Sequence, residues 1–275
     1  MNLRLEKHLV ITLLFGILVA NGVGAAAQQP DRTDHAALIK MLSDELRPHE
    51  GAGLDHYAAI KEGVSRDLLD ELDAFVCVGF PGESTAAGVK AKLDAALDRK
   101  EGDLEQNVVF WADLPLGRFL VIGVELQGAG TNATEGYGNR VLFRAYKQSG
   151  GKFVYVASVE NLASSALAGL NAEILKGAPV EGEFWFIAWA DVPPLAPFKI
   201  ATRIYAFDGK SFRTVWEPEN FIASSIRDAV QATPDGRGFV VNEMPNFQSQ
   251  TINHEQYYLT ADGPQKVGEW TSERE

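Results

Sequence analysis

The sequence predicts a mainly β protein with a helical N-terminal part, in which about three four-stranded antiparallel meanders follow one another. Residues 28–105 contain three aromatic residues, whereas residues 106–275 contain twenty-three, and aromatic side chains favour strands. Tight, glycine-containing turns separate several apolar runs of the second part, as in antiparallel hairpins. Three of these hairpins also resemble one another. A β-sandwich is the alternative architecture for the same strands.

Residues 1–27 have the pattern of a signal peptide. A positively charged start precedes a mostly apolar run over residues 9–20, and the small residues Ala25 and Ala27 suit cleavage before Gln28. The apolar run is shorter than the roughly 20 residues of a membrane-spanning helix. We therefore expect a secreted or periplasmic protein with no membrane span after leader cleavage; a leader retained as an anchor is the alternative.

Composition narrows the classes of partner. The formal net charge is −12 and charged residues make up 23% of the chain, which fits a folded domain and argues against nonspecific binding to nucleic acid or to an anionic membrane. The single cysteine, Cys77, excludes an intrachain disulfide framework. Its apolar sequence neighbours predict that it packs in a core.

The helical region spans residues 28–105 and is expected to hold three helices. The first begins after Asp34, ends before Pro48 and has its apolar residues at helical spacing. A second helix is predicted from Ser65 through Leu72, followed by a short apolar strand over residues 75–80. A third helix is predicted over about 84–97, with four residues on one face: Val89, Leu93, Ala96 and Leu97.

The β domain spans residues 106–275 and contains a series of predicted strands. Trp185 and Trp189 share one strand face and are expected to pack in the core. Turns are predicted at residues 149–151, 208–210 and 262–264, where glycine supplies a positive φ. The strands are expected at 107–111, 118–126, 140–147, 152–159, 183–190, 200–207, 211–216, 229–233, 238–244, 256–260 and 265–270.

An internal repeat of about 55–60 residues is indicated by two sets of matches. Three hairpins align through Tyr146, Tyr205 and Tyr258, which are 59 and 53 residues apart, and residues 161–165 resemble residues 220–225. A unit of this size has room for four strands, which is the anatomy of a propeller blade. The predicted units are 106–160, 161–217 and 218–271, and residues 164–171 must then form the first strand of the second unit. Chance similarity between hairpins is the alternative explanation.

A short motif resembles a known repeat family. Residues 232–241 contain Thr233-Pro234-Asp235-Gly236-Arg237, which is similar to the Ser-Pro-Asp-Gly-Arg turn of TolB-type β-propeller repeats. This resemblance implies a turn that joins the first two strands of a blade. Because closed propellers usually need at least four blades, either the helical part fills the missing wedge or the sheets pack as a sandwich.

One segment fits a catalytic interpretation. Ser84 lies in Gly-Glu-Ser-Thr-Ala between an apolar run and a predicted helix, and this segment resembles the nucleophile elbow of carboxylesterases. His254 lies downstream, with Asp208 and Asp228 between them, in the chain order of an α/β-hydrolase. Against this hypothesis, the fifth position is Ala86 instead of glycine and the alternating βα pattern is absent. The alternative is that Ser84 or Thr85 caps a helix.

Metal and cofactor motifs are not found in the sequence. His35, His49 and His56, with Glu50 and Asp55, lack the spacing of a shared helix face, so we predict no metal site and no cofactor.

Two long loops, at residues 127–139 and 191–197, are the expected binding regions. The first carries the glycosylation sequon at Asn132 together with Tyr137, and Phe198 follows the second. The predicted function is that of a secreted, non-enzymatic protein that binds a protein or a cell-envelope component through loops at one end of its sheets. The alternative is a secreted serine hydrolase that uses Ser84 and His254.

Overall fold

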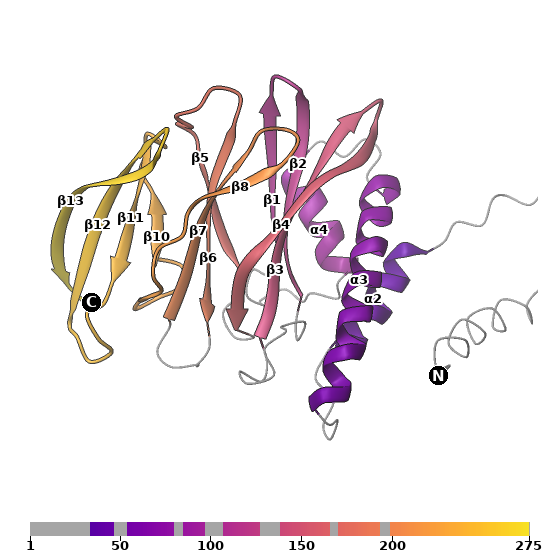
Figure 1. Cartoon of the computed structure of the whole chain (residues 1–275), viewed down its shortest axis with the longest axis horizontal. Coiled ribbons are helices and arrows are strands. Elements are labelled where there is room, and N and C mark those ends of the chain that lie inside the picture. Colours follow the sequence, from indigo (N-terminus) through magenta and orange to yellow (C-terminus); the bar gives the residue numbers. More distant parts are fainter. Residues whose placement is uncertain are drawn as a thin grey trace, which may run out of the picture. The chain divides into compact units, whose positions relative to one another are not determined.

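A computed structural model of the chain describes residues 34–46, 54–79, 85–96, 107–126, 138–165, 170–192 and 199–274. The described part contains the helices α2 (His35–Leu46), α3 (Leu54–Gly79) and α4 (Ala86–Ala96), followed by strands (Figure 1). Residues 1–27, including the predicted signal peptide, lie outside it. None of the described helices is long and apolar enough to cross a membrane.

The strands form three antiparallel sheets, each built from four strands in chain order. The short strand β9 (Phe221–Ile222) adds to the second sheet by pairing with β7. The first sheet contains β1 (Asn107–Leu114), β2 (Gly117–Leu126), β3 (Gly138–Ser149) and β4 (Lys152–Ser165), the second β5 (Asn171–Leu175), β6 (Phe184–Val192), β7 (Lys199–Phe207) and β8 (Phe212–Trp216), and the third β10 (Val230–Ala232), β11 (Gly238–Glu243), β12 (Thr251–Thr260) and β13 (Gly263–Glu273).

Three apolar cores join the helices and the sheets into successive layers (Figure 1). The first core lies between the helices and the first sheet, the second between the first and second sheets, and the third between the second and third sheets. On β2, Leu120 and Ile122 face the helices, whereas Phe119 and Val121 face the second sheet. On β6, Phe186 faces the first sheet while Trp185 and Ile187 face the third. Strands buried on both faces have nearly continuous apolar sequences, which explains why most strands were predictable. Three antiparallel four-stranded sheets are confirmed, and none of them is closed.

The predicted strand at residues 75–80 is wrong, because α3 continues through Gly79. Leu68, Leu72 and Val76 follow one another at intervals of four residues, and all three are buried against the first core. This spacing places them on one helix face. The apolar run after Leu72 therefore extends the buried face of the helix and does not begin a strand.

The first and third predicted helices are confirmed. Among the side chains that the structure describes, Ile39 and Leu42 are buried in α2, and Val89, Leu93 and Ala96 are buried in α4. Just before α4, the Thr85 hydroxyl accepts a hydrogen bond from the Gly88 N–H (3.1 Å), so Thr85 caps this helix.

The three sheets share a shift in register between their third and fourth strands. The shift directly precedes Tyr146 in the first sheet, Tyr205 in the second and Tyr257 in the third. In each sheet, the residue paired with this tyrosine lies nine positions later in the chain. Each tyrosine also packs in the core toward the preceding layer.

The hairpin alignment through Tyr258 is therefore wrong by one residue. Tyr258 points away from the second sheet and is 43% exposed, whereas Tyr257 occupies the place of Tyr146 and Tyr205. Both residues are tyrosine, and the sequence offers no other mark that separates them. A one-residue displacement moves a side chain to the other face of a sheet.

The second sequence match occupies equivalent places in two sheets. Leu162 pairs with Val141, and Phe221 pairs with Ile200, so both lie beside the beginning of the third strand. The expected first strand over residues 164–171 is wrong, because β4 continues to Ser165 and β5 begins at Asn171.

The predicted turn at residues 233–237 joins β10 to β11, the first two strands of the third sheet. The Asp235 carboxylate accepts hydrogen bonds from the Thr233 hydroxyl (2.6 Å) and the Arg237 N–H (3.0 Å), which hold its pKa below the usual range. The turn also contacts the second sheet, where the Gly177 N–H donates to the Gly236 carbonyl (2.9 Å).

Gly236 tests how much this contact between sheets stabilises the fold. Gly236 and Gly150 both have positive φ, 68° and 58°, and an alanine there costs about 1–2 kcal/mol. A Cβ at Gly236 lies 2.7 Å from the Lys176 Cβ, whereas a Cβ at Gly150 meets nothing within 4 Å. We expect Gly236→Ala to lower the free energy of unfolding, measured in urea, by about 1–3 kcal/mol more than Gly150→Ala does. Equal losses contradict an inter-sheet role for the turn.

Buried tyrosines predict a loss of stability at alkaline pH. Burial raises the pKa of Tyr146 and Tyr205 well above the usual value, whereas tyrosine in an unfolded chain ionises near pH 10. Above about pH 10 the unfolded chain binds fewer protons than the folded chain, so stability falls as pH rises, by about 1.4 kcal/mol per buried tyrosine at about pH 11.

Urea unfolding at about pH 8 and about pH 11 measures this loss. We expect Tyr205→Phe to reduce the loss relative to Tyr258→Phe, which changes an exposed tyrosine. The same loss in both variants is the contrary result.

Candidate interaction surface

The structure describes some residues of the hydrolase hypothesis and not others. Ser84 lies outside the described residues; its neighbour Thr85 caps α4, which packs near β1. His254 lies on β12 of the third sheet, where its ring contacts Asn242 and Ser272. Asp208 lies in the turn after β7, where its carboxylate accepts hydrogen bonds from two backbone N–H groups. The use of Ser84 as a nucleophile stays a prediction.

The other sequence candidates are described only in part. His35 Nδ1 lies 2.7 Å from the Glu71 Oε2 atom, across α2 and α3. Among the described residues there is no group of three or more potential metal ligands. The following candidates lie wholly, or with their side chains, outside the described part: His49, Glu50, Asp55, His56, Asn132, Tyr137 and Phe198.

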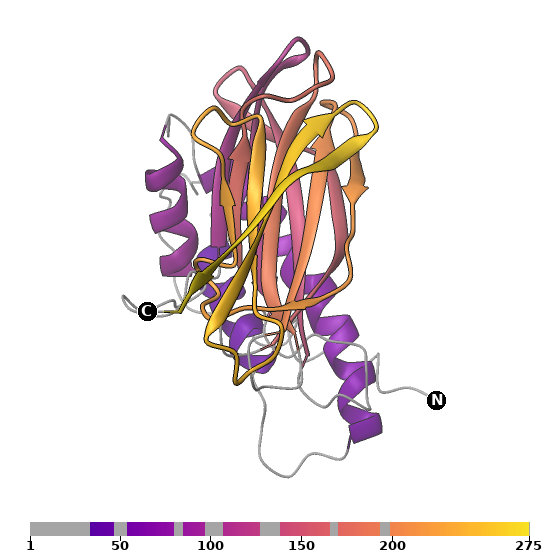
Figure 2. The same ribbon diagram turned by 90° about the vertical axis from the view of Figure 1, so that its left-hand side faces the viewer.

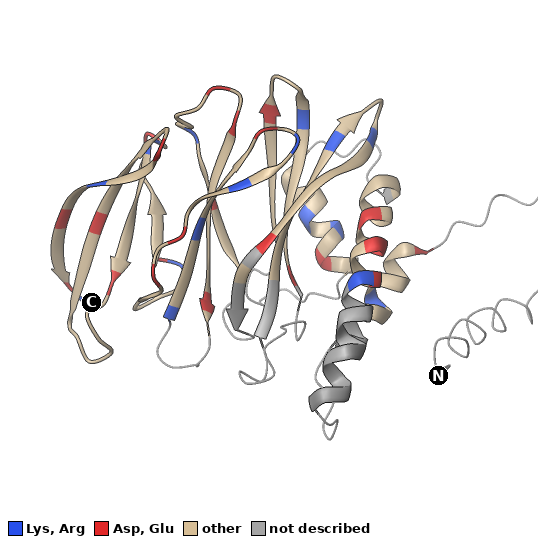
Figure 3. Cartoon of the chain, in the orientation of Figure 1, with Lys and Arg blue, Asp and Glu red and all other residues tan. Residues whose placement is uncertain are grey.

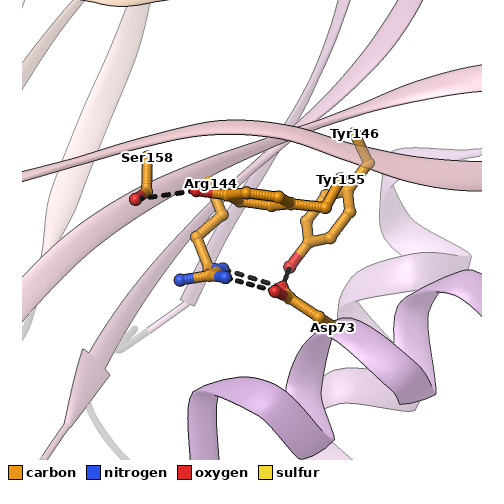
Figure 4. Close-up of polar contacts among 5 residues, drawn as sticks. All are labelled: Asp73, Arg144, Tyr146, Tyr155 and Ser158. Atoms are coloured by element: carbon orange, nitrogen blue, oxygen red, sulfur yellow. Dashed lines mark hydrogen bonds and ion pairs between the residues drawn. The ribbon is translucent and has the colours of Figure 1, made fainter. Parts of the chain in front are cut away.

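A polar cluster around Asp73 joins α3 to the first sheet (Figure 4). The Asp73 carboxylate accepts hydrogen bonds from Arg144 Nε (2.8 Å), from Arg144 Nη2 and from the Tyr146 hydroxyl (2.7 Å). The Arg144 guanidinium also lies 4.5 Å from the centre of the Tyr155 ring, and the Tyr155 hydroxyl donates to Ser158 Oγ (3.1 Å). Arg144 is 8% exposed.

This arrangement is a structural clamp. Burial acts against the charged guanidinium, but its hydrogen bonds to Asp73 and the nearby charges leave the pKa of Arg144 raised. Burial raises the pKa of the Tyr146 hydroxyl well above its usual value, so the hydroxyl stays a donor. Three donors converge on one carboxylate, which fixes the orientation of α3 on the sheet.

Removal of Asp73 leaves the Arg144 charge buried without its partner. We expect Asp73→Ala to lower the free energy of unfolding by about 3–5 kcal/mol, measured by urea denaturation. Asp113→Ala is the control, because its exposed pair with Arg118 (3.5 Å) contributes less than about 1 kcal/mol. The double variant Asp73→Leu/Arg144→Met should recover part of the loss. Equal losses for the two single alanine variants contradict the clamp.

The outer face of the third sheet, which we call the open face, points away from the second sheet. Phe239, Val241 and Leu259 point toward the second sheet, so alternate residues point away from it. Within the part of the chain that the structure describes, no helix or strand lies over this face in Figure 2. The register assigns thirteen residues to the open face: Gln231, Gly238, Val240, Asn242, Ile252, His254, Gln256, Tyr258, Thr260, Gln265, Gly268, Trp270 and Ser272.

The open face carries none of the chain's Asp, Glu, Lys or Arg residues among its thirteen positions. Soluble domains carry these residues at roughly 25–35% of their surface positions, so about four are expected. Charged residues occur on the helices and on all three sheets (Figure 3). The charged residues of β11–β13 all lie on the opposite face of the third sheet: Glu243, Glu255, Lys266, Glu269 and Glu273.

Hydrogen bonds and ring stacking hold the centre of the open face. The His254 ring stacks on Trp270, with ring centroids 5.0 Å apart and planes 13° apart. His254 Nδ1 lies 2.7 Å from Asn242 Oδ1, and Nε2 lies 2.8 Å from Ser272 Oγ. The Asn242 amide in turn donates to the Asp228 carbonyl, so its oxygen accepts from Nδ1–H. These hydrogen bonds hold the His254 ring in place. The Trp270 ring that stacks on it is 46% exposed.

The open face was missed by the sequence analysis, which placed binding in the loops. Its signal is the distribution of charge in β12 and β13, in which all the charged residues fall on one side of the strands once the register shift is taken into account. No protein-family model, curated protein or solved structure matches this chain. A function must therefore be inferred from the geometry of the described residues.

Proposed function

We propose that this chain is a secreted or periplasmic, non-enzymatic binding protein that docks a partner on the open face. The observation that carries the proposal is the composition of β13, an edge strand exposed on both sides. Lys266, Glu269 and Glu273 are exposed on one side, whereas Trp270 and Ser272 are exposed on the other. Water contacts both sides, so exposure alone does not explain why one side is free of charge.

The composition of the open face is that of the centre of a protein interface. Interface centres are depleted in charged residues and enriched in Trp and Tyr, and such aromatic residues dominate binding energy. Trp270 and Tyr258 are 46% and 43% exposed. Their desolvation by a partner supplies a favourable apolar contribution, while the surrounding amides and hydroxyls can form hydrogen bonds.

We further infer that the three sheets are blade-like units of an open, propeller-like array that is related to TolB-type repeats. The equivalent register shifts at Tyr146, Tyr205 and Tyr257 support this inference. The turn at residues 233–237 also joins the first two strands of its sheet, as the resemblance implies. In such an array the last unit has a free face, which is the proposed docking surface.

Site-specific photocrosslinking in the producing cells tests the docking surface. We place p-benzoylphenylalanine at Gln265, which is exposed on the open face, and at Val154 on β4, which is 55% exposed. We expect a crosslinked product of higher mass from Gln265 and none from Val154. Similar products at both positions, or none at Gln265, contradict the proposal.

A further inference from the structure

We infer that the partner on the open face is a second copy of this chain, packed against the first by two-fold symmetry. This inference rests on the proposed function and specifies its partner. In the resulting complex the third sheets of the two copies lie face to face. The layers then run from the helices of one copy through six sheets to the helices of the other.

The stacking already present in one chain is the first argument. The first sheet packs on the second, and the second on the third, through cores between sheet faces. The helices close the free face of the first sheet through a further core. A two-fold copy continues the same mode of packing at the other end and leaves helices as the outermost layers. Two-fold symmetry is also the commonest arrangement of homo-oligomers.

Charge is the second argument. The chain carries a net charge of −12, so two copies repel each other unless the surfaces in contact are free of like charge. The open face fulfils this condition. A basic partner, in contrast, is recognised by acidic residues, and the acidic residues of β11–β13 lie on the other face of the sheet.

Self-complementarity is the third argument. In a two-fold interface each group meets the same surface that presents it. The side-chain amides of Gln256 and Gln265 each offer donors and an acceptor, so they can pair with the same groups in a copy. A surface that holds only carboxylates or only ammonium groups cannot do this.

The area of the open face indicates how strongly two copies can associate. β12 and β13 have ten and eleven residues, and β10 and β11 have three and six. With about 3.3 Å per residue and about 4.8 Å between strands, the face covers roughly 480 Å² in projection. Two copies together bury roughly 1,000 Å² before side-chain relief is counted, near the lower limit of specific interfaces. We therefore expect a dimer with a dissociation constant in the micromolar range.

Sedimentation velocity of the leader-free protein over a range of concentrations tests the inference. We expect a reversible change from one copy to two as the concentration rises. Gln256 lies at the middle of β12, so the same charge introduced there in both copies is repelled. Gln256→Glu and Gln256→Arg should each weaken association at least ten-fold. Gln148→Glu, on the first sheet, should leave association unchanged.

The opposite signs of charge separate self-association from other partners. A charged partner of different chemistry responds in opposite directions to Gln256→Glu and Gln256→Arg, whereas a copy of the same chain responds to both in the same direction. A single copy at every concentration, or association that neither Gln256 variant weakens, overturns the inference. If the chain stays monomeric but Gln265 crosslinks to a different molecule, the docking surface stands and only the identity of its occupant is wrong.

Discussion

A sheet with two apolar faces is stable only when another layer covers each face, and this requirement determines how the whole chain is arranged. The first and second sheets are apolar on both faces, so each must lie between two layers. The helices form the outer layer on the first sheet, and Asp73 fixes their position there through Arg144 and Tyr146. Without this layer, Leu120, Ile122 and the other residues of the first core have no partner.

The shared register shift explains how three sheets of different sequence stack. A bulge increases the local twist of a strand, and stacked sheets need similar twist to keep their faces in contact. Each sheet has its shift beside the same tyrosine position, at Tyr146, Tyr205 and Tyr257. The tyrosine ring then fills the space toward the preceding layer. Packing and strand geometry are therefore linked at one place in every sheet.

Most strands were predictable from the sequence because their local signals are strong. Apolar runs ended by Asp208-Gly209 or Gly150-Gly151 leave few alternatives for a hairpin. Three features were not predictable for physical reasons. The apolar run after Leu72 suits a strand or a buried helix face, and only the first core decides between them. Tyr257 and Tyr258 have the same side chain, so only the register shift shows which one packs against the core between the second and third sheets. The open face could not be recognised without the pairing of four strands, because that pairing brings distant residues such as Gln231 and Trp270 onto one surface.

The outermost sheet faces at the two ends of the stack differ in the chemistry of their exposed or covered groups. At the helical end, a buried guanidinium meets a carboxylate in one geometry, because the five N–H groups of arginine are rigidly arranged. That chemistry gives a permanent layer with one orientation. At the open end, the exposed groups are amides, hydroxyls and aromatic rings, whose desolvation costs far less than that of a charge. A surface of this kind can exist in water and can also be covered, so it suits a contact that forms and dissociates. The position of the charges on β13, all on the side away from the open face, keeps the protein hydrated without adding to the cost of covering that face.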